Sequence, residues 1–236
     1  RIYAAASRQQ KRLDVLYRLV FNLIYTGNRN RDVASLLDTI KAILNKYFPQ
    51  DRGLYAKFFF LRGCREYFLG HYPESISLFR ESIRMASGTT LRWTYRAAFH
   101  RYLALAYQGI YDFRRMEEEL KKALSLAIGA EAPPYQYAWD LHELSILYIS
   151  YLGLQKKGIE YGLKALEAYK SAPSPNPDMI IQMTTTIGLY YQIGFDLTQA
   201  NQYFTQAENL IVQNKHKNIF LLKNLYSNIG GWSIGL

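Results

Sequence analysis

The sequence predicts an all-α fold, a right-handed superhelical solenoid built from helical hairpins. Small or polar residues follow an apolar residue at spacings of 41, 41, 41, 43 and 42, at Asn22, Gly63, Ala104, Ser145, Gly188 and Gly230. An aromatic residue comes three positions after most of them, and pairs of mostly small residues seven apart recur further along each unit. A fixed period of this length is typical of repeat proteins whose units stack on one another.

The first helix of each unit is predicted from the small residue and the aromatic residue one helical turn later, which share a helix face. The aromatic positions are Tyr25, Tyr67 (which here follows Glu66), Tyr107, Tyr148 and Tyr191. The second helix is predicted from the pairs seven apart, because seven residues make two helical turns and small side chains let a neighbouring helix approach closely. These pairs are Ser35/Ala42, Ser75/Ser82, Met116/Ala123, Gly158/Ala165 and Ala200/Ala207.

Short turns separate the two helices of a unit, as in the segments 69–74 and 193–196, which contain Gly70 and Gly194. Glycine suits the left-handed backbone that ends a helix, and Pro73 suits the start of the next one. Large residues are then expected to fill the space between hairpins, namely Phe79, Leu120, Tyr161 and Phe204. The expected helices span residues 6–26, 30–47, 53–69, 73–86, 91–109, 113–127, 135–152, 155–170, 177–194, 197–213 and 217–232.

The segment 171–177 contains three prolines and is expected to be a surface loop, since each proline removes a backbone donor. The repeat resumes in phase after it. We therefore expect one repeat domain over residues 1–236, with about five hairpins and a truncated sixth.

These positions resemble the tetratricopeptide repeat (TPR), in which a small residue follows Leu, an aromatic comes one turn later, and small, aromatic and small residues line the second helix. The fifth unit matches best, with Gly188, Tyr191, Ala200, Phe204 and Ala207 in the family's order. The period is longer than the usual ~34 residues, and the proline that ends each repeat is mostly absent. The resemblance thus points to the long-repeat subtype, as in bacterial transcription regulators, peptide-sensing proteins and kinesin light chain.

The sixth unit stops near Gly230, Gly231 and Trp232 without a second helix to cover it. Uncovered repeats expose apolar surface. We therefore expect the chain to be a fragment of a longer protein, or to self-associate through this end. By the resemblance, the missing part would be the DNA-binding or signalling domain of a regulatory protein.

The formal charge of +10 is concentrated in the N-terminal half, with +6 in residues 1–56, +5 in 57–127 and −1 in 128–236. This asymmetry suggests an acidic partner. A nucleic-acid-binding solenoid is the alternative function, because the 21 tyrosines could stack on bases. Most of these tyrosines occupy repeat-packing positions, which favours a protein or peptide partner. No segment is apolar enough to predict membrane contact.

Catalysis is not predicted. The four histidines are too scattered for a local metal motif, and no phosphate-binding glycine loop or serine nucleophile motif appears, so we expect no metal and no cofactor. His142 and Glu143 are adjacent on a helix and point in different directions. The lone Cys64 lies near Arg62 and Arg65 but is better read as a small helix-interior residue. One cysteine fits a reducing compartment such as the cytoplasm, without excluding an oxidising one.

The resemblance implies a concave ligand groove lined by the first helices. The family's groove positions correspond here to Phe60, Leu61, Cys64, Tyr67, Arg101, Tyr102, Leu105, Gln108, His142, Glu143, Ile146, Ile149, Thr185, Thr186, Leu189 and Gln192. The Lys and Asn set with which chaperone-type TPR domains hold a terminal carboxylate is missing. We therefore expect an extended peptide held by amide and arginine contacts, in a water-filled groove faced by the stripe Arg101, Tyr102, His142, Thr185 and Gln192. Binding is expected to weaken on Arg101→Ala combined with Gln192→Ala.

Overall fold

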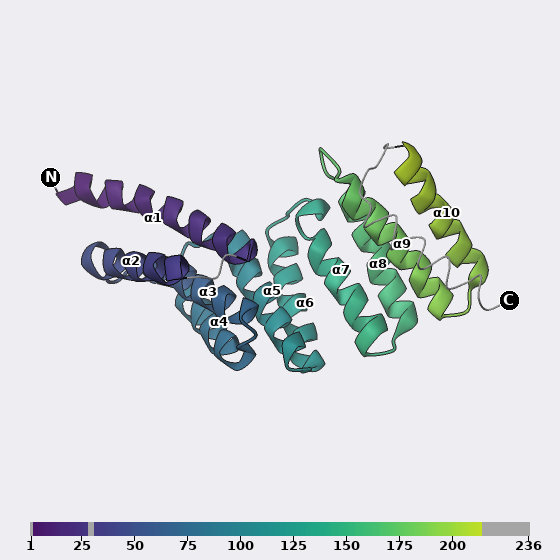
Figure 1. Ribbon diagram of the computed structural model, residues 1–236, viewed down its shortest axis with the longest axis horizontal. Helices are drawn as coiled ribbons and strands as arrows, with labels where there is room; N and C mark the ends of the chain where they lie inside the picture. The colour runs from purple at the N-terminus through teal and green to yellow at the C-terminus, as the bar shows by residue number, and fades with distance from the viewer. Residues whose placement is uncertain (1, 28–30, 214–236) are drawn as a thin grey trace. The chain divides into compact units, whose positions relative to one another are not determined.

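The computed structural model describes residues 2–27 and 31–213, which form α-helices and contain no strand (Figure 1). The all-α prediction is therefore confirmed for these residues. The helices are α1 Ile2–Tyr25, α2 Arg31–Tyr47, α3 Arg52–Phe68, α4 Tyr72–Ala86, α5 Trp93–Gly109, α6 Phe113–Gly129, α7 Ala138–Ile146, α8 Gln155–Lys170, α9 Pro177–Ile193 and α10 Leu197–Gln213. None of them is both long enough and apolar enough to cross a bilayer.

The helices pack as successive hairpins, α1/α2, α3/α4, α5/α6, α7/α8 and α9/α10. The chain divides into two compact units, residues 1–130 and 131–236, which are described separately here. The predicted sixth hairpin, residues 217–232 with Gly230, lies outside the described residues. That the repeats form one continuous domain stays a prediction.

Small residues occupy the crossing of the two helices in hairpins two to five, as the repeat pattern predicts. Gly63, Ala104, Ser145 and Gly188 are all buried. A Cβ at Gly63 would lie 2.6 Å from the Phe79 ring, and one at Gly188 would lie 2.8 Å from the Phe204 ring. Large residues of α4 and α10 can therefore lie against the first helix only because these positions are glycine.

The small-residue pairs of the second helices are buried in the same four hairpins, at Ser75, Ser82, Met116, Ala123, Gly158, Ala165, Ala200 and Ala207. The first hairpin differs, because Asn22, Ser35 and Ala42 are exposed and the prediction for them was wrong. Here α1 and α2 bury branched side chains instead, among them Val20 and Ile40. Bulky side chains fill this boundary, so close approach through small residues is not required.

The predicted helix 135–152 is broken into three pieces. A 3-10 turn, η1 Pro134–Gln136, precedes α7, and a π-helical segment, η2 Leu147–Tyr151, follows it. A π segment accommodates one extra residue in a helix and turns the following side chains away from their α-helical direction. It places Ile149 over Gly158 of α8, so Ile149 is buried inside its own hairpin and is not a groove residue as predicted.

Among residues 2–27 and 31–213, the turn of each hairpin contains one residue with positive φ. These residues are Gly27, Gly70, Tyr111, Gly153 and Phe195. In the turns of Gly70, Tyr111 and Phe195 the same two backbone hydrogen bonds form. In the last of them, Phe195 N–H donates to the Gln192 carbonyl and Asp196 N–H donates to the Tyr191 carbonyl, each at 3.0 Å. This is the Schellman arrangement, which satisfies the last carbonyls of a helix.

The sequence assigned the left-handed position of the fifth turn to Gly194, and this was wrong, because Phe195 has φ 61° and Gly194 has φ −86°. The hydrogen-bond pattern fixes which residue must be left-handed, whatever its type. Gly194 has another role, since any Cβ there would collide with Gln155. The Gln155 side chain donates to the Tyr190 carbonyl at 2.9 Å and so links α8 to α9.

We expect Phe195→Gly to raise the free energy of unfolding by about 0.5–1 kcal/mol, because glycine adopts this conformation without strain. The Phe195 side chain is 88% exposed, so little packing is lost. Phe195→Ala is the matched control, since it removes the ring but keeps Cβ. Urea denaturation of the three proteins measures the effect, and equal stability of both variants would contradict it.

Candidate functional site

The structure divides nine of the predicted groove residues by exposure. Tyr67, Arg101, Tyr102, Gln108, Glu143 and Gln192 are partly exposed, whereas Phe60, His142 and Thr185 are buried. His142 and Thr185 were expected to face water, and this was wrong. The His142 ring lies edge-on to Tyr169 of α8, 6.3 Å between centroids, and the Thr185 hydroxyl donates to the Ile181 carbonyl of its own helix. That the remaining residues bind a ligand stays a prediction.

In the first unit, the first helices of three consecutive hairpins bring their aromatic rings together. Their six rings, here called the inner aromatic cluster, are Phe21 and Tyr25 of α1, Phe60, Tyr67 and Phe68 of α3, and Tyr102 of α5. The rings form a continuous series of contacts with centroids 5.2–6.4 Å apart. Only Phe60 is buried, and Tyr25 is 68% exposed, so the cluster is a surface as well as a packing element.

Phe60 connects this cluster to the buried core. Its ring contacts Phe79 of α4 at 5.8 Å and Phe99 of α5 at 5.0 Å, both of which are completely buried. The partly exposed rings are therefore held on a rigid floor. Aromatic pairs at these distances add about 0.5–1.5 kcal/mol beyond their area burial.

The Tyr102 hydroxyl is neutral at physiological pH. Burial raises the pKa of Tyr102 above its ordinary value, and the nearby Cys64 thiol and Tyr25 hydroxyl raise it further. A neutral tyrosine presents an apolar ring together with a hydroxyl that can donate or accept a hydrogen bond. Arg101 and Gln108, both on α5, supply a guanidinium and an amide on the same helix as Tyr102.

Cys64 and His142 are not placed for catalysis. Cys64 is completely buried, and burial raises its pKa well above the ordinary value, which keeps it a thiol. Burial lowers the pKa of His142 to about 4, and its Nδ1 has no hydrogen-bond partner among the described residues. A nucleophile or general base needs a partner and access to substrate, and neither residue has both.

One cluster of possible metal ligands does not follow the histidine and cysteine spacing of a local metal motif. Glu66 at the end of α3 lies with His71 and Glu74 at the start of α4, with one ligand atom of each within 4.8 Å of the others. Glu66 already bonds Arg65 and the His71 Nδ1, each at 2.8 Å. The turn fixed by Gly70 brings these residues together, and the result is an ion-paired hairpin turn.

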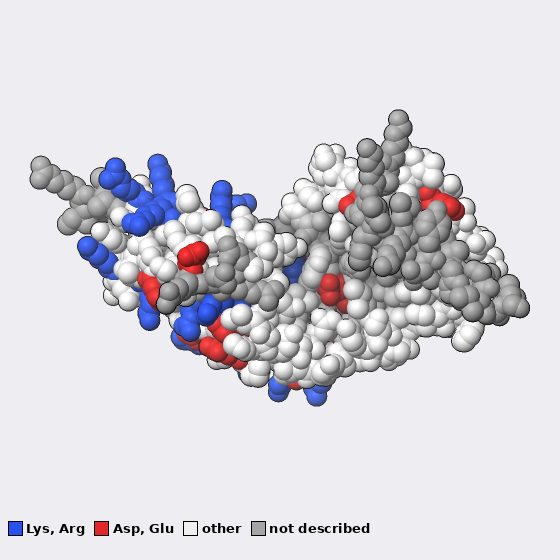
Figure 2. Space-filling model, viewed as in Figure 1, with Lys and Arg blue, Asp and Glu red and all other residues white. Residues whose placement is uncertain are grey.

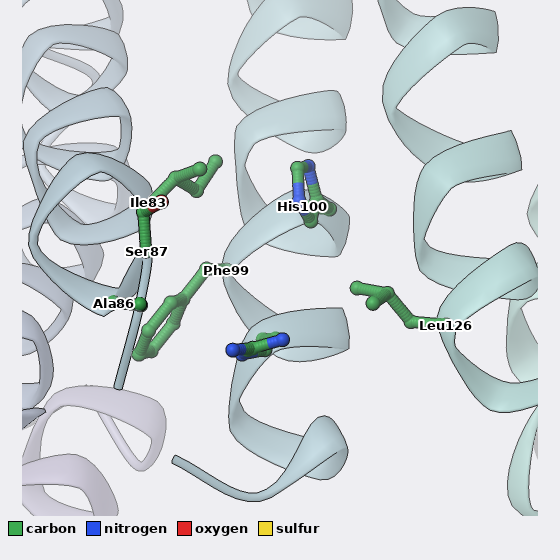
Figure 3. Close-up of a pocket in the computed structure, with 8 residues that line it drawn as sticks. Ile83, Ala86, Ser87, Phe99, His100 and Leu126 are labelled. Carbon is green, nitrogen blue, oxygen red and sulfur yellow. The ribbon is translucent and has the colours of Figure 1, made fainter. Parts of the chain in front are cut away.

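A second feature absent from the sequence analysis is a cavity of about 310 Å³ among α4, α5 and α6 (Figure 3). Ile83, Ala86 and Ser87 lie on one side of it, His100 comes from α5, and Leu126 projects from α6. Its lining comes partly from second helices, α4 and α6, so it is separate from the inner aromatic cluster.

The charge asymmetry predicted from the sequence is visible on the surface. Figure 2 shows lysine and arginine side chains gathered over the first unit on the face drawn, whereas few appear on the second unit. On α1 alone, Arg8, Lys11, Arg12 and Arg18 are exposed.

No model of a known protein family matches the sequence, and no curated protein matches it. Solved structures match the fold. BtubC (BKLC) from P. vanneervenii aligns with a TM-score of 0.78 and 17% identity, over 92% of this chain and 89% of that chain. A Rap protein complexed with competence and sporulation factor aligns at 0.58 and 15%, over 94% and 73%. TTC0263, a thermophilic TPR protein of Thermus thermophilus, aligns at 0.57 and 19%, over 92% and 98%. At these identities the likeness shows the fold alone, and that fold is the TPR-like solenoid of helical hairpins.

Proposed function

We propose that the chain is a non-catalytic protein- or peptide-binding module that uses the inner aromatic cluster as its contact surface. The observation that carries the proposal is the continuous series of contacts among the partly exposed rings of α1, α3 and α5. Tyrosine and phenylalanine offer a large contact area with few rotatable bonds, so ordering them on binding costs little entropy.

The ligand that suits this surface is an extended peptide with apolar side chains. The rings of Tyr25, Tyr67 and Tyr102 would cover such side chains, while their hydroxyls bond the peptide backbone. Arg101 and Gln108 stand one and six residues from Tyr102 and would add directional contacts to carbonyl or carboxylate groups.

The comparisons add support at the level of the fold. One matching structure is, by its description, a Rap protein complexed with competence and sporulation factor, so this architecture holds a bound factor in that case. A sensor or scaffold role in a bacterial regulatory protein belongs to the same proposal, as does self-association through the C-terminal end. The burial of Cys64 and His142 favours binding over catalysis.

The proposal is tested by selecting peptides from a random display library on the purified chain and measuring their affinity by fluorescence anisotropy. Tyr25→Ala is expected to weaken binding at least tenfold, because Tyr25 is the most exposed ring of the cluster yet contacts Phe21 and Phe68. Tyr111→Ala is the matched control, since Tyr111 is 78% exposed in a turn outside the cluster.

A selected peptide that tolerates Tyr25→Ala but loses affinity on substitution of Lys121 and Lys122, which are exposed on α6, would contradict the proposal. The four exposed cations of α1 favour nucleic acid as a second candidate. Suppose that an oligothymidylate binds more tightly than any peptide and that its affinity falls steeply as the salt concentration rises. Nucleic-acid binding would then replace peptide binding as the proposed function.

A further inference from the structure

Two adjoining cavities of about 310 Å³ each form one groove on the first unit, between α4 and α6 with α5 as its floor. They share Ile83 and His100, which lie at the middle of the groove. Ile83 and Leu126 are partly exposed on its two walls (Figure 3). An apolar side chain can therefore be covered at its centre.

One end of the groove concentrates positive charge around a single tyrosine. Arg80 of α4 donates to the Tyr107 hydroxyl at 2.6 Å, and its guanidinium lies 5.7 Å from the centroid of the Tyr107 ring. The Arg115 guanidinium of α6 lies at the same distance from that ring. Arg115 also pairs with Asp112 at 3.2 Å, but a guanidinium has several N–H donors, so Arg80 and Arg115 can still both bond an anion placed beside the ring. Such an anion would also reduce the repulsion between the two positive charges.

The other end of the groove holds Arg96 of α5. One of its terminal nitrogens donates to the Thr89 carbonyl at 3.0 Å, while its buried Nε has no hydrogen-bond partner within residues 2–27 and 31–213. A buried donor without an acceptor costs about 1–3 kcal/mol. A carboxylate would supply the missing acceptor and, with the guanidinium, a charge-assisted bond.

The acidic residues of the groove are already neutralised by neighbours. Glu119 accepts hydrogen bonds from His100 at 2.5 Å and from Lys122 at 2.7 Å. Burial raises the pKa of Glu119, but these two bonded partners together lower it by more, so the pKa lies below its ordinary value. Glu118 pairs with Arg114 at 3.4 Å. The groove therefore attracts anions through Arg80, Arg115 and Arg96 rather than cations through its carboxylates.

The two cationic ends are set a defined distance apart. Arg96 and Tyr107 are eleven residues apart on one helix, which corresponds to about 16 Å, the length of roughly five residues of extended chain. We propose that this groove between α4 and α6, here called the outer groove, binds an extended acidic peptide. The peptide's carboxylates bond Arg80 and Arg115 at one end and Arg96 at the other. An apolar side chain of the peptide lies between Ile83 and Leu126.

The probe is a fluorescein-labelled heptapeptide of sequence Glu-Glu-Gly-Leu-Gly-Glu-Glu, with a version carrying lysine for glutamate as its charge control. Arg80→Ala and Arg96→Ala are each expected to weaken binding at least fivefold, and the double variant at least twentyfold, in fluorescence anisotropy. Arg84→Ala is the matched control, because Arg84 is an exposed arginine on α4 that pairs with Glu81 outside the groove. It should leave the affinity unchanged.

Leu126→Glu provides a test that does not depend on removing an arginine, since it places a negative charge in the groove wall and should abolish binding while circular dichroism stays unchanged. Tyr25→Ala should have no effect, which separates this site from the inner aromatic cluster. Equal weakening by Arg84→Ala and Arg80→Ala, binding of the lysine peptide, or displacement of the probe by a tighter-binding oligothymidylate at these same arginines would each overturn the proposal.

Discussion

Acidification from pH 7 to pH 4 is expected to lower the free energy of unfolding of the α7/α8 hairpin by about 3 kcal/mol through His142 alone. Burial lowers the pKa of His142 from 6.5 to about 4 in the folded chain. Above pH 6.5 the ring is neutral in both states and adds no penalty. As the pH falls below 6.5, His142 binds a proton in the unfolded chain but not in the folded chain. The free energy of unfolding therefore declines until about pH 4 and is constant below it.

The measurement is hydrogen exchange, followed by mass spectrometry, of peptides covering α7 and α8 at pH 7, 6, 5 and 4, after correction for intrinsic exchange. His142→Leu cannot titrate, so its stability should decline less steeply over this range, and the difference between the two curves isolates the histidine from the carboxylates. Parallel curves would show that His142 becomes protonated in the folded hairpin.

Gly188→Leu is expected to cost about 1–3 kcal/mol, the range found when a well-packed crossing is overfilled. Gly188 is buried where α9 crosses α10, and its Cβ would lie 2.8 Å from the Phe204 ring and 3.3 Å from the Tyr203 Cβ. The Phe204 ring is itself 4% exposed and belongs to a core with Ile181, Ala200 and Ala207, so it cannot move aside freely.

Gly129→Ala is the control for this substitution. Gly129 also lies in a helix, at the end of α6, but a Cβ there would meet no atom of the described residues within 4 Å. It is expected to be neutral or to stabilise by up to ~1 kcal/mol, because alanine has the higher helix propensity. Chemical denaturation of both variants is the measurement, and an unchanged midpoint for Gly188→Leu would show that α9 and α10 separate easily.

The repeat made the fold predictable from the sequence. Residues such as Gly63 and Gly188 recur because helix crossings tolerate only small side chains, and that constraint is local enough to be read from spacing alone. Helix ends were also largely predictable, since Pro73 and the proline-rich segment 171–177 act within a few residues. The loop between Lys170 and Pro177 lies where the prolines place it.

The candidate site was less predictable, because a helix in a solenoid has neighbours on two sides. His142 occupies a groove position of the family pattern, yet its ring packs against Tyr169. Spacing gives the angular position of a side chain only while the helix stays regular, and the π segment after α7 changes it for Ile149. The identity of the neighbour that covers each face depends on how hairpins stack.

The outer groove could not be predicted at all, because its parts come from three helices. Arg80, Arg96 and Arg115 are far apart in the sequence, and each alone is an ordinary surface cation. The contacts of Arg80 and Arg115 with Tyr107 form only when α4 and α6 both pack against α5, the helix that also carries Arg96. No short-range pattern marks such a convergence.

The left-handed residue in the turn inside each hairpin affects how such a chain can lengthen. In the second, third and fifth turns the residue after it, His71, Asp112 or Asp196, is also the last residue before the next helix. The Asp112 and Asp196 carboxylates each accept a bond from a backbone N–H of that helix. Each hairpin therefore carries the groups that end its first helix and begin its second. A duplicated segment of 41 to 43 residues brings its own turn with it, so a copy inserted in phase folds back correctly without any new sequence at the junction between its two helices.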